Sequence, residues 1–180
     1  MRLINLITVV FLLYCSTLKA QSFIGFNYEP FMLIDEENKS IPAEYRGDNV
    51  RTYPFSLYLN YSIKLNKDFA ISIRPGALIT DSHYNGAEIM LLTKYYWGDK
   101  NYILGGLNVH GNYPSSTIAK GVVIPLLVLG AGFNFMKVIE LEAHYELPFN
   151  KEYTWKSSSV FGPKKLNGIL KLSLGFEFEL

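Results

Sequence analysis

Ionisable side chains occupy every second position in one short part of this sequence: Glu140, Glu142, His144 and Glu146. Carboxylate and imidazole groups ligate metal ions and carry protons. Glu142, His144 and Glu146 could therefore form a metal site, and the cluster could also be a path for protons or cations. A more ordinary role is a set of buried charges that pair with one another. Successive side chains of a β-strand point to opposite faces, so a strand would place all four on one face.

Eight segments of the chain repeat this two-residue alternation, which is typical of strands with one apolar and one polar face. The last segment is the clearest, because every even position from Leu170 to Leu180 is apolar and every odd position between them is charged or small. The predicted strands lie at roughly residues 22–33, 52–65, 69–80, 86–97, 101–111, 122–135, 138–149 and 166–180.

The connections between the predicted strands alternate between short and long. The short ones are Asn66-Lys67-Asp68, Gly98-Asp99-Lys100 and Met136-Lys137, and the long polar ones lie near residues 34–51, 112–121 and 150–165. Residues 81–85 form a compact link, and the pair Asn85-Gly86 favours a type I′ hairpin turn. Short turns on one rim and longer loops on the other are the layout of outer-membrane barrels. An even number of strands then places both termini on the rim of the short turns.

The first twenty residues have the features of a secretory signal peptide. Arg2 gives a positive start, an apolar stretch follows, and Leu18-Lys19-Ala20 offers a cleavage site. The apolar stretch is too short for a membrane-spanning helix, which needs about 20 residues. We expect a cleaved signal peptide at residues 1–20 and one domain at residues 21–180. An amphipathic strand, a buried helix or a lipoprotein signal ending at Cys15 are the alternatives.

The composition of residues 21–180 excludes several classes of function. Cleavage removes Arg2 and Lys19, which leaves 15 of the 17 basic residues against 16 acidic ones, so the charge gives no basis for nucleic-acid binding. The single cysteine, Cys15, leaves with the signal peptide, so no disulfide or thiolate metal site is expected. No uncharged apolar run after residue 21 approaches about 18 residues. A membrane protein of this kind must be a closed barrel, because lipid cannot satisfy the edge of a sheet.

Aromatic side chains on the apolar faces gather near two levels of the predicted barrel. Near the turn rim they are Phe69, Tyr95, Trp97, Phe133, Phe135, Phe176 and Phe178; near the loop rim they are Tyr28, Tyr53, Phe55, Tyr145 and Phe149. Two aromatic girdles around an aliphatic band mark the two interfaces of a membrane with water. The alternative is that these rings fill the core of a soluble protein.

The opposite faces carry charged side chains, which we expect to fill the interior of the barrel. They are Glu29, Lys64, Arg74, Glu88, Lys94, Glu140, Glu142, His144, Glu146, Lys171, Glu177 and Glu179. Eight strands leave a lumen just wide enough for side chains, which argues against a general porin. Because buried charges must be paired or solvated, we expect a network of ion pairs and waters, with Lys171 as a partner of the carboxylates on residues 138–149.

Three further residues need comment. Pro75 has no N–H group to donate within the third predicted strand, and with Gly76 it predicts a bulge or kink there. His83 and His110 lie near the loop rim, where we expect them to be solvated surface residues.

Taken together, these features resemble the small eight-stranded outer-membrane barrels of the OmpA and OmpX type, over nearly all of residues 21–180. The resemblance implies an all-β fold, an eight-stranded antiparallel up-and-down transmembrane β-barrel, in the outer membrane of a Gram-negative bacterium. It also implies contact with outer-membrane lipids and lipopolysaccharide, and insertion by the barrel-assembly machinery. Members of this group usually end in an aromatic residue, whereas this chain ends in Leu180, with Phe178 two places earlier. We expect a monomer without cofactor or metal.

The expected function is a structural or surface-interaction role through the extracellular loops, where binding residues tend to lie. The last loop combines Lys164 and Lys165 with Tyr153 and Trp155, which could contact anionic lipopolysaccharide or a partner protein. Loops of ordinary charge in solvent are the alternative. A narrow channel for water, ions or small solutes and a soluble lipocalin-like carrier also remain open.

An enzyme that modifies lipid A is a further alternative, because some small barrels do so. The segment Ala143-His144-Tyr145-Glu146 is weakly similar to the His-x-Ser motif of outer-membrane lipid A deacylases. Glu146 takes the place of the serine, and without a nucleophile beside the base there is no acyl-transfer site. We therefore expect no enzymatic activity.

Overall fold

Ten β-strands make up the part of the chain that the structure, a computed structural model, describes: residues 20–35, 40–41, 54–79, 86–112, 122–149, 154–156 and 163–180. Eight of the strands are long: β1 (Gln21–Asp35), β3 (Phe55–Lys64), β4 (Phe69–Ile79), β5 (Gly86–Trp97), β6 (Asn101–Asn112), β7 (Val122–Met136), β8 (Ile139–Pro148) and β10 (Pro163–Glu179). Within these residues, no helix is long and apolar enough to cross a membrane.

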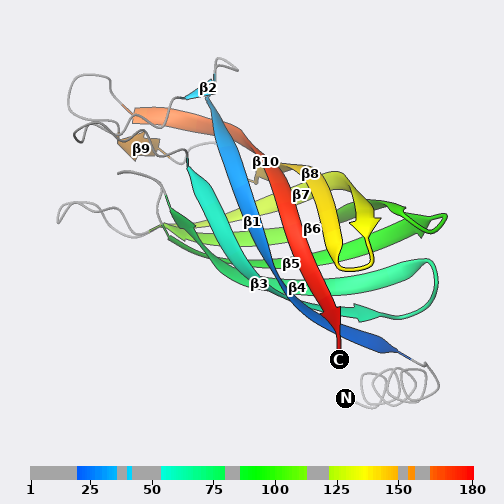
Figure 1. Cartoon of the computed structure of the whole chain (residues 1–180). Helices are drawn as coiled ribbons and strands as arrows, with labels where there is room; N and C mark the ends of the chain where they lie inside the picture. Colours follow the sequence, from blue (N-terminus) through cyan, green and yellow to red (C-terminus); the bar gives the residue numbers. More distant parts are fainter. Residues whose placement is uncertain are drawn as a thin grey trace, which may run out of the picture.

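The eight long strands form a closed antiparallel barrel (Figure 1). Each pairs with the next long strand along the chain, and β1 pairs with β10 to close the sheet. The short strands β2 (Ser40–Ile41) and β9 (Thr154–Lys156) pair with the loop-side ends of β1 and β10. The predicted fold class is confirmed, and the predicted strands differ from the observed ones by at most three residues at either end.

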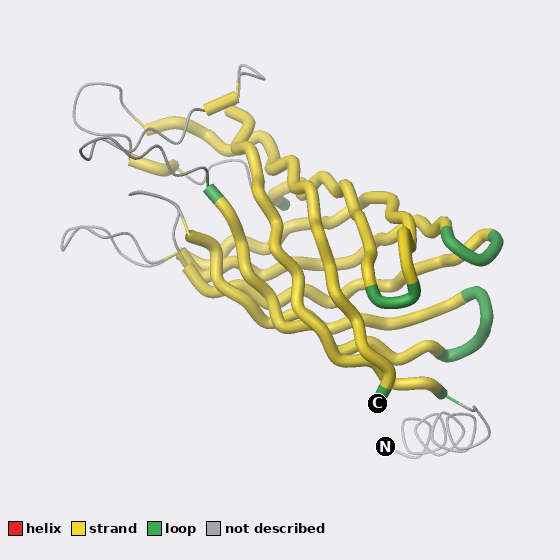
Figure 2. The backbone as a smooth tube through the Cα atoms, in the orientation of Figure 1, coloured by secondary structure: helices red, strands yellow, loops and turns green. Residues whose placement is uncertain are grey.

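The short turns, the start of β1 and the end of β10 lie on one rim of the barrel (Figure 2). In the turn between β3 and β4, the side-chain oxygen of Asn66 accepts hydrogen bonds from the N–H groups of Asp68 and Phe69, at 2.8 and 2.9 Å. Gly98 begins the turn between β5 and β6 with a φ of +77°, a left-handed conformation that glycine adopts without strain. The side chains of Gln21 and Glu179, at the start of β1 and the end of β10, are joined by a 3.0 Å hydrogen bond.

The remaining connections fall outside the described residues. This applies to the expected signal peptide up to residue 19, to the centres of the three long loops and to the link at residues 81–85 with its Asn85-Gly86 turn.

Alternation of polar and apolar residues fixes which face of each strand points inward. In β8, Glu140, Glu142 and Glu146 are buried, whereas Leu141 is exposed on the outer surface. A slip of one residue would turn every side chain of this strand to the other face. A lysine or arginine on the lipid face destabilises a barrel by roughly 2–4 kcal/mol, and an acidic group destabilises it by less. The three glutamates of β8 together would still cost several kcal/mol.

Large apolar side chains cover the outer surface of the barrel. Examples with 45–68% of their surface exposed are Ile24, Leu59, Ile103, Leu129, Leu141 and Leu172. Aromatic rings pair on the same surface: those of Phe26 and Phe176 stack at 4.8 Å, and those of Phe69 and Tyr95 lie 5.0 Å apart. The predicted girdle residues that the structure describes all point outward, and Tyr53 lies outside the described residues.

Pro75 does not produce the predicted bulge. Along residues 55–64 and 69–79, the partners of β3 and β4 keep one register from Leu57–Ala77 to Tyr61–Ile73. Pairing lapses only between these points, opposite Pro75, whereas Pro75 keeps its partner Ile89 on β5. The barrel accommodates the missing N–H group by losing ladder contacts on one side, so no extra residue is needed.

An irregularity that the sequence analysis did not predict occurs near the loop end of β10. Its pairing with β1 shifts between Ile34 and Asp35, so that Leu166 and Ile169 are both buried although their positions differ by an odd number. These two residues belong to a buried apolar cluster that fills the loop end of the lumen: Phe31, Leu33, Leu78, Ile124, Leu126, Leu166 and Ile169.

Candidate functional site

Ten Glu, Arg, Lys and His side chains are buried inside the described barrel, and His110 is one of them. The other nine are here termed the lumen network: Glu29, Arg74, Glu88, Lys94, Glu140, Glu142, His144, Glu146 and Lys171. All nine were expected in the lumen from the alternation of the sequence. The other three expected residues lie towards the turn rim. Lys64 and the Glu177 side chain are partly exposed, and Glu179 is exposed. The charges therefore concentrate in the closed middle of the barrel.

Arg74 of β4 joins two carboxylates of β8. Its Nη1 and Nη2 atoms donate to Glu142 Oε2 and Oε1 at 2.6 and 2.8 Å, and Nη2 also donates to Glu140 Oε1 at 3.2 Å. Such a two-pronged contact between guanidinium and carboxylate is strong and directional. Lys94 of β5 reaches the same carboxylates, with its Nζ atom 2.6 Å from Glu140 Oε2. This half of the network ties β4 and β5 to the opposite wall.

Lys171 of β10 organises the other half of the network. Its Nζ atom lies 2.9 Å from Glu146 Oε1, the expected contact with the carboxylates of β8, and 2.9 Å from Glu88 Oε2 on β5. Tyr58 also donates a hydrogen bond to Glu88. Lys171 therefore connects two carboxylates on different walls.

His110 is not the solvated surface residue that the sequence analysis expected. It is fully buried, and its Nδ1 atom lies 3.1 Å from Glu88 Oε1. The two-residue alternation of β6 indicates that His110 points inward, because Tyr102, Leu104 and Asn108 occupy the same inward face. His110 was expected at the surface because it lies close to the end of the predicted strand. The other histidine in that expectation, His83, lies outside the described residues.

Uncharged polar side chains complete the network, and the sequence analysis did not single them out. Tyr102 donates to Glu140 and Glu142 at 3.0 and 2.8 Å. Asn27 donates to Glu140 Oε1 at 3.3 Å, and Asn108 donates to Glu146 Oε2 at 3.0 Å. Tyr102 and Asn27 add hydrogen bonds to carboxylate oxygens that Arg74 or Lys94 also contact. Such hydrogen bonds are a requirement for burying charge.

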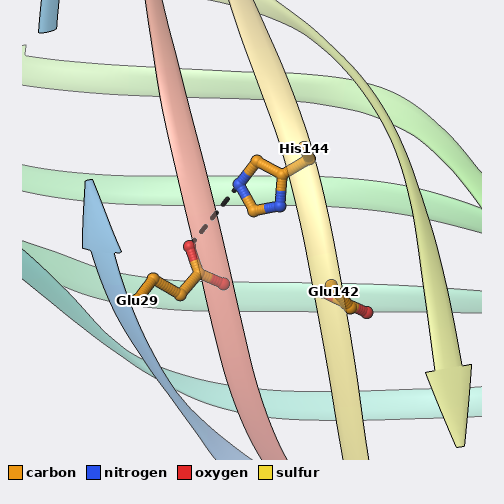
Figure 3. Close-up of side chains that lie close together, drawn as sticks. All are labelled: Glu29, Glu142 and His144. Atoms are coloured by element: carbon orange, nitrogen blue, oxygen red, sulfur yellow. Dashed lines mark ion pairs between the residues drawn. The ribbon is translucent and has the colours of Figure 1, made fainter. Parts of the chain in front are cut away.

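A group of possible metal ligands lies inside the barrel where β1 and β8 flank β10 (Figure 3). It comprises Glu29, Glu142 and His144, whose ligand atoms all lie within 4.8 Å of one another. The trio considered from the sequence contained Glu146 instead of Glu29. Glu146 does lie near His144, with 3.4 Å between Oε1 and Nε2, but its Oε1 atom is also held by Lys171.

The chain matches no known family model and no curated protein sequence. Among solved structures it is similar to Neisserial surface protein A, with a TM-score of 0.53 and 11% identity over 89% of this chain and 99% of that chain. It is also similar to the N-terminal β-barrel domain of Pseudomonas aeruginosa OprF, with a TM-score of 0.49 and 11% identity over 89% and 98% of the two chains. At 11% identity the similarity to Neisserial surface protein A shows the fold alone, that of the small eight-stranded outer-membrane barrels.

Proposed function

We propose that this chain is an outer-membrane barrel with a structural or surface-interaction role, which presents its long loops to the cell exterior and keeps its lumen closed by side chains. The observation that carries the proposal is the sorting of side chains: an ion-pair network lies inside the barrel, and large apolar groups cover its outside.

The outer surface supports a membrane environment. Soluble monomers rarely expose continuous apolar patches larger than a few hundred Å². Here apolar residues such as Leu59, Leu129 and Leu172 project from strands around the barrel. Hydrocarbon solvates these groups at no cost, and the closed sheet leaves no backbone edge unpaired in lipid. We infer contact with outer-membrane lipids and lipopolysaccharide, and insertion by the barrel-assembly machinery with Phe178 as the nearest terminal aromatic residue.

The interior argues against a lipocalin-like carrier and against a channel. A carrier for apolar ligands needs an apolar cavity, whereas Arg74, Lys94 and Lys171 are fully buried inside this barrel with their carboxylate partners. A channel needs a continuous wet path, but the apolar cluster around Leu126 and Ile169 fills the loop end of the lumen. Ion pairs across the lumen would have to break before a solute could pass.

A deacylase-like activity is also disfavoured. His144 is buried in the lumen instead of facing lipid, where an acyl chain would lie. In the described strands, neither of its ring nitrogens has a hydrogen-bond partner, so no hydroxyl is held by this imidazole as an activated nucleophile. We infer that the barrel is a scaffold and that its loops carry the function.

Fractionation of the producing cells tests the membrane assignment. We expect the chain in the outer-membrane fraction, soluble only with detergent and with a gel mobility that changes after boiling. Recovery as a monodisperse protein in buffer without detergent would refute the proposal.

Planar-bilayer recordings test the closed lumen. We expect no steady openings from the wild-type barrel. The matched variants Leu126→Ser, in the apolar cluster, and Leu129→Ser, on the outer face, separate a lumen effect from a general weakening of the barrel. Wild-type openings that change with Leu126→Ser but not with Leu129→Ser would instead establish transport through the lumen.

A further inference from the structure

The buried lumen network carries more negative than permanent positive charge. Its five carboxylates are Glu29, Glu88, Glu140, Glu142 and Glu146, and its three permanent cations are Arg74, Lys94 and Lys171. Two negative charges therefore lack a permanent partner. Uncompensated charge is costly in a site without solvent, so the excess is neutralised either by protons on the lumen groups, among them His144 and the neighbouring His110, or by a bound cation.

Of the five carboxylates, Glu29 has the weakest contact with a permanent cation. Glu140 and Glu142 lie 2.6 Å from Lys94 and Arg74, and Glu88 and Glu146 each lie 2.9 Å from Lys171. In contrast, the shortest contact of Glu29 with a permanent cation is 3.5 Å, from its Oε1 atom to Arg74 Nη1. Among the residues that the structure describes, its Oε2 atom has no hydrogen-bond partner, although the side chain is fully buried.

The Oε2 atom of Glu29 points towards His144 (Figure 3). The distance from Oε2 to Nε2 is 3.6 Å, which is longer than the roughly 2.7–3.2 Å of an ordinary hydrogen bond. The second ring nitrogen, Nδ1, is likewise buried and has no hydrogen-bond partner within the described strands and turns. Two buried groups that are both good metal ligands thus face each other at a distance longer than that of an ordinary hydrogen bond, and Nε2 of His144 also lies 3.4 Å from Glu146 Oε1.

This separation suits a bound metal ion. Zinc binds histidine nitrogen and carboxylate oxygen at about 2.0–2.2 Å in a tetrahedron, so two of its ligand atoms lie roughly 3.3–3.6 Å apart. Glu142 supplies a third ligand atom within 4.8 Å of the other two, and its carboxylate would have to move closer to them to complete the site. We propose that Glu29, Glu142 and His144 bind one divalent cation of the zinc class inside the lumen.

The charge of such an ion matches the charge of the site. A divalent cation cancels the two excess negative charges of the lumen network. A ligand set of one imidazole and two carboxylates favours zinc over magnesium or calcium, which prefer oxygen ligands alone.

The positive charge of Arg74 would repel a bound cation, because Arg74 contacts both Glu142 and Glu29. These contacts still leave lone pairs free on both carboxylates. Glu142 Oε2 accepts one hydrogen bond in the described part of the chain, from Arg74 Nη1, and a carboxylate oxygen has two lone pairs. Carboxylates that ligate metals are commonly hydrogen-bonded to a second group, so Arg74 would orient Glu142 for the ion.

This inference departs from the sequence analysis, which expected no metal, and it goes beyond the proposed function. The ion would join β1 to β8 through the lumen and strengthen a barrel that already has its fold. A surface role of the loops does not depend on it, so either proposal can fail alone.

The test measures zinc in the full chain, purified in detergent from a bacterial outer membrane. The protein is dialysed against a chelator, exposed to zinc and desalted, and the metal per chain is determined by mass spectrometry. We expect about one zinc ion per wild-type chain. Glu29→Gln and His144→Gln should weaken zinc binding by more than about a hundredfold, since loss of an outer-shell partner alone costs 10–100-fold.

Glu177→Gln and His83→Gln are the matched controls, and both should retain zinc. Boiling-dependent gel mobility establishes that each variant has formed a barrel. If a ligand variant does not fold, the visible spectrum of cobalt loaded into the wild-type chain tests the site instead. This spectrum distinguishes cobalt bound by imidazole and carboxylate groups from solvated cobalt.

Three results would overturn the proposal: a wild-type chain that retains no zinc when the metal is present during growth and loading, unchanged binding in both ligand variants, or the spectrum of solvated cobalt. In each case protons on the lumen groups would supply the missing charge.

Discussion

Replacement of Arg74 by methionine should destabilise the barrel strongly. Methionine keeps an unbranched side chain of similar length but removes the charge and every donor. In the wild-type protein Arg74 makes two short hydrogen bonds to Glu142 and a third to Glu140. All of these groups are buried, so the substitution would leave carboxylates without their partner and without water.

The cost follows from this geometry. Removal of one partner of a buried ion pair typically costs about 3–5 kcal/mol, because the remaining charge stays buried. This corresponds to a decrease of about a hundredfold to several thousandfold in the folding equilibrium. Lys94 lies 2.6 Å from Glu140 and 3.2 Å from Glu142, which places the expected cost of Arg74→Met near the lower end of that range.

Urea unfolding of the barrel in lipid vesicles, followed by tryptophan fluorescence, measures this difference. Lys64→Met is the matched control, because Lys64 is partly exposed and contacts the ring of Tyr96 at 5.1 Å. That substitution should cost less than about 1 kcal/mol. In the Arg74→Met background, adding Glu142→Gln should recover part of the loss, with a coupling energy of about 1–3 kcal/mol. An Arg74→Met cost no larger than that of Lys64→Met would refute the buried network.

Three other substitutions test the lipid face, the packing of the lumen and the turns by the same unfolding assay. Leu59→Lys, near the middle of β3, should cost about 2–4 kcal/mol in vesicles because Leu59 faces lipid, and a neutral effect would contradict that orientation. Gly175→Ala should cost about 1–3 kcal/mol, since the added carbon would lie 2.5 Å from Asn27 Nδ2 and 2.6 Å from Glu140 Cγ; unchanged stability would mean that these side chains are not fixed there. Gly98→Ala should cost about 1 kcal/mol because of its positive φ, although nothing obstructs the added carbon, and a stabilising effect would argue against that turn.

The amino-acid sequence by itself determined the strands, their inward and outward faces and the rim of each described turn. These are local properties, because a two-residue alternation specifies both a strand and its two faces. The prediction of residues 86–97 coincides with β5, and the observed turn of Asn66 to Asp68 is the predicted one. The closure of the sheet into a barrel was predicted as well, because lipid cannot satisfy the backbone groups at an open sheet edge.

Only the tertiary structure decided which lumen groups contact one another. Arg74 and Glu142 are 68 residues apart in sequence, and Glu29 meets His144 through the lumen from a different strand. Such contacts depend on the stagger of every strand between them, which alternation does not encode. For the same reason the irregular pairing that buries both Leu166 and Ile169 was not foreseen. His110 was misplaced on other grounds, because it lies on the inward face of β6 but close to a predicted strand end.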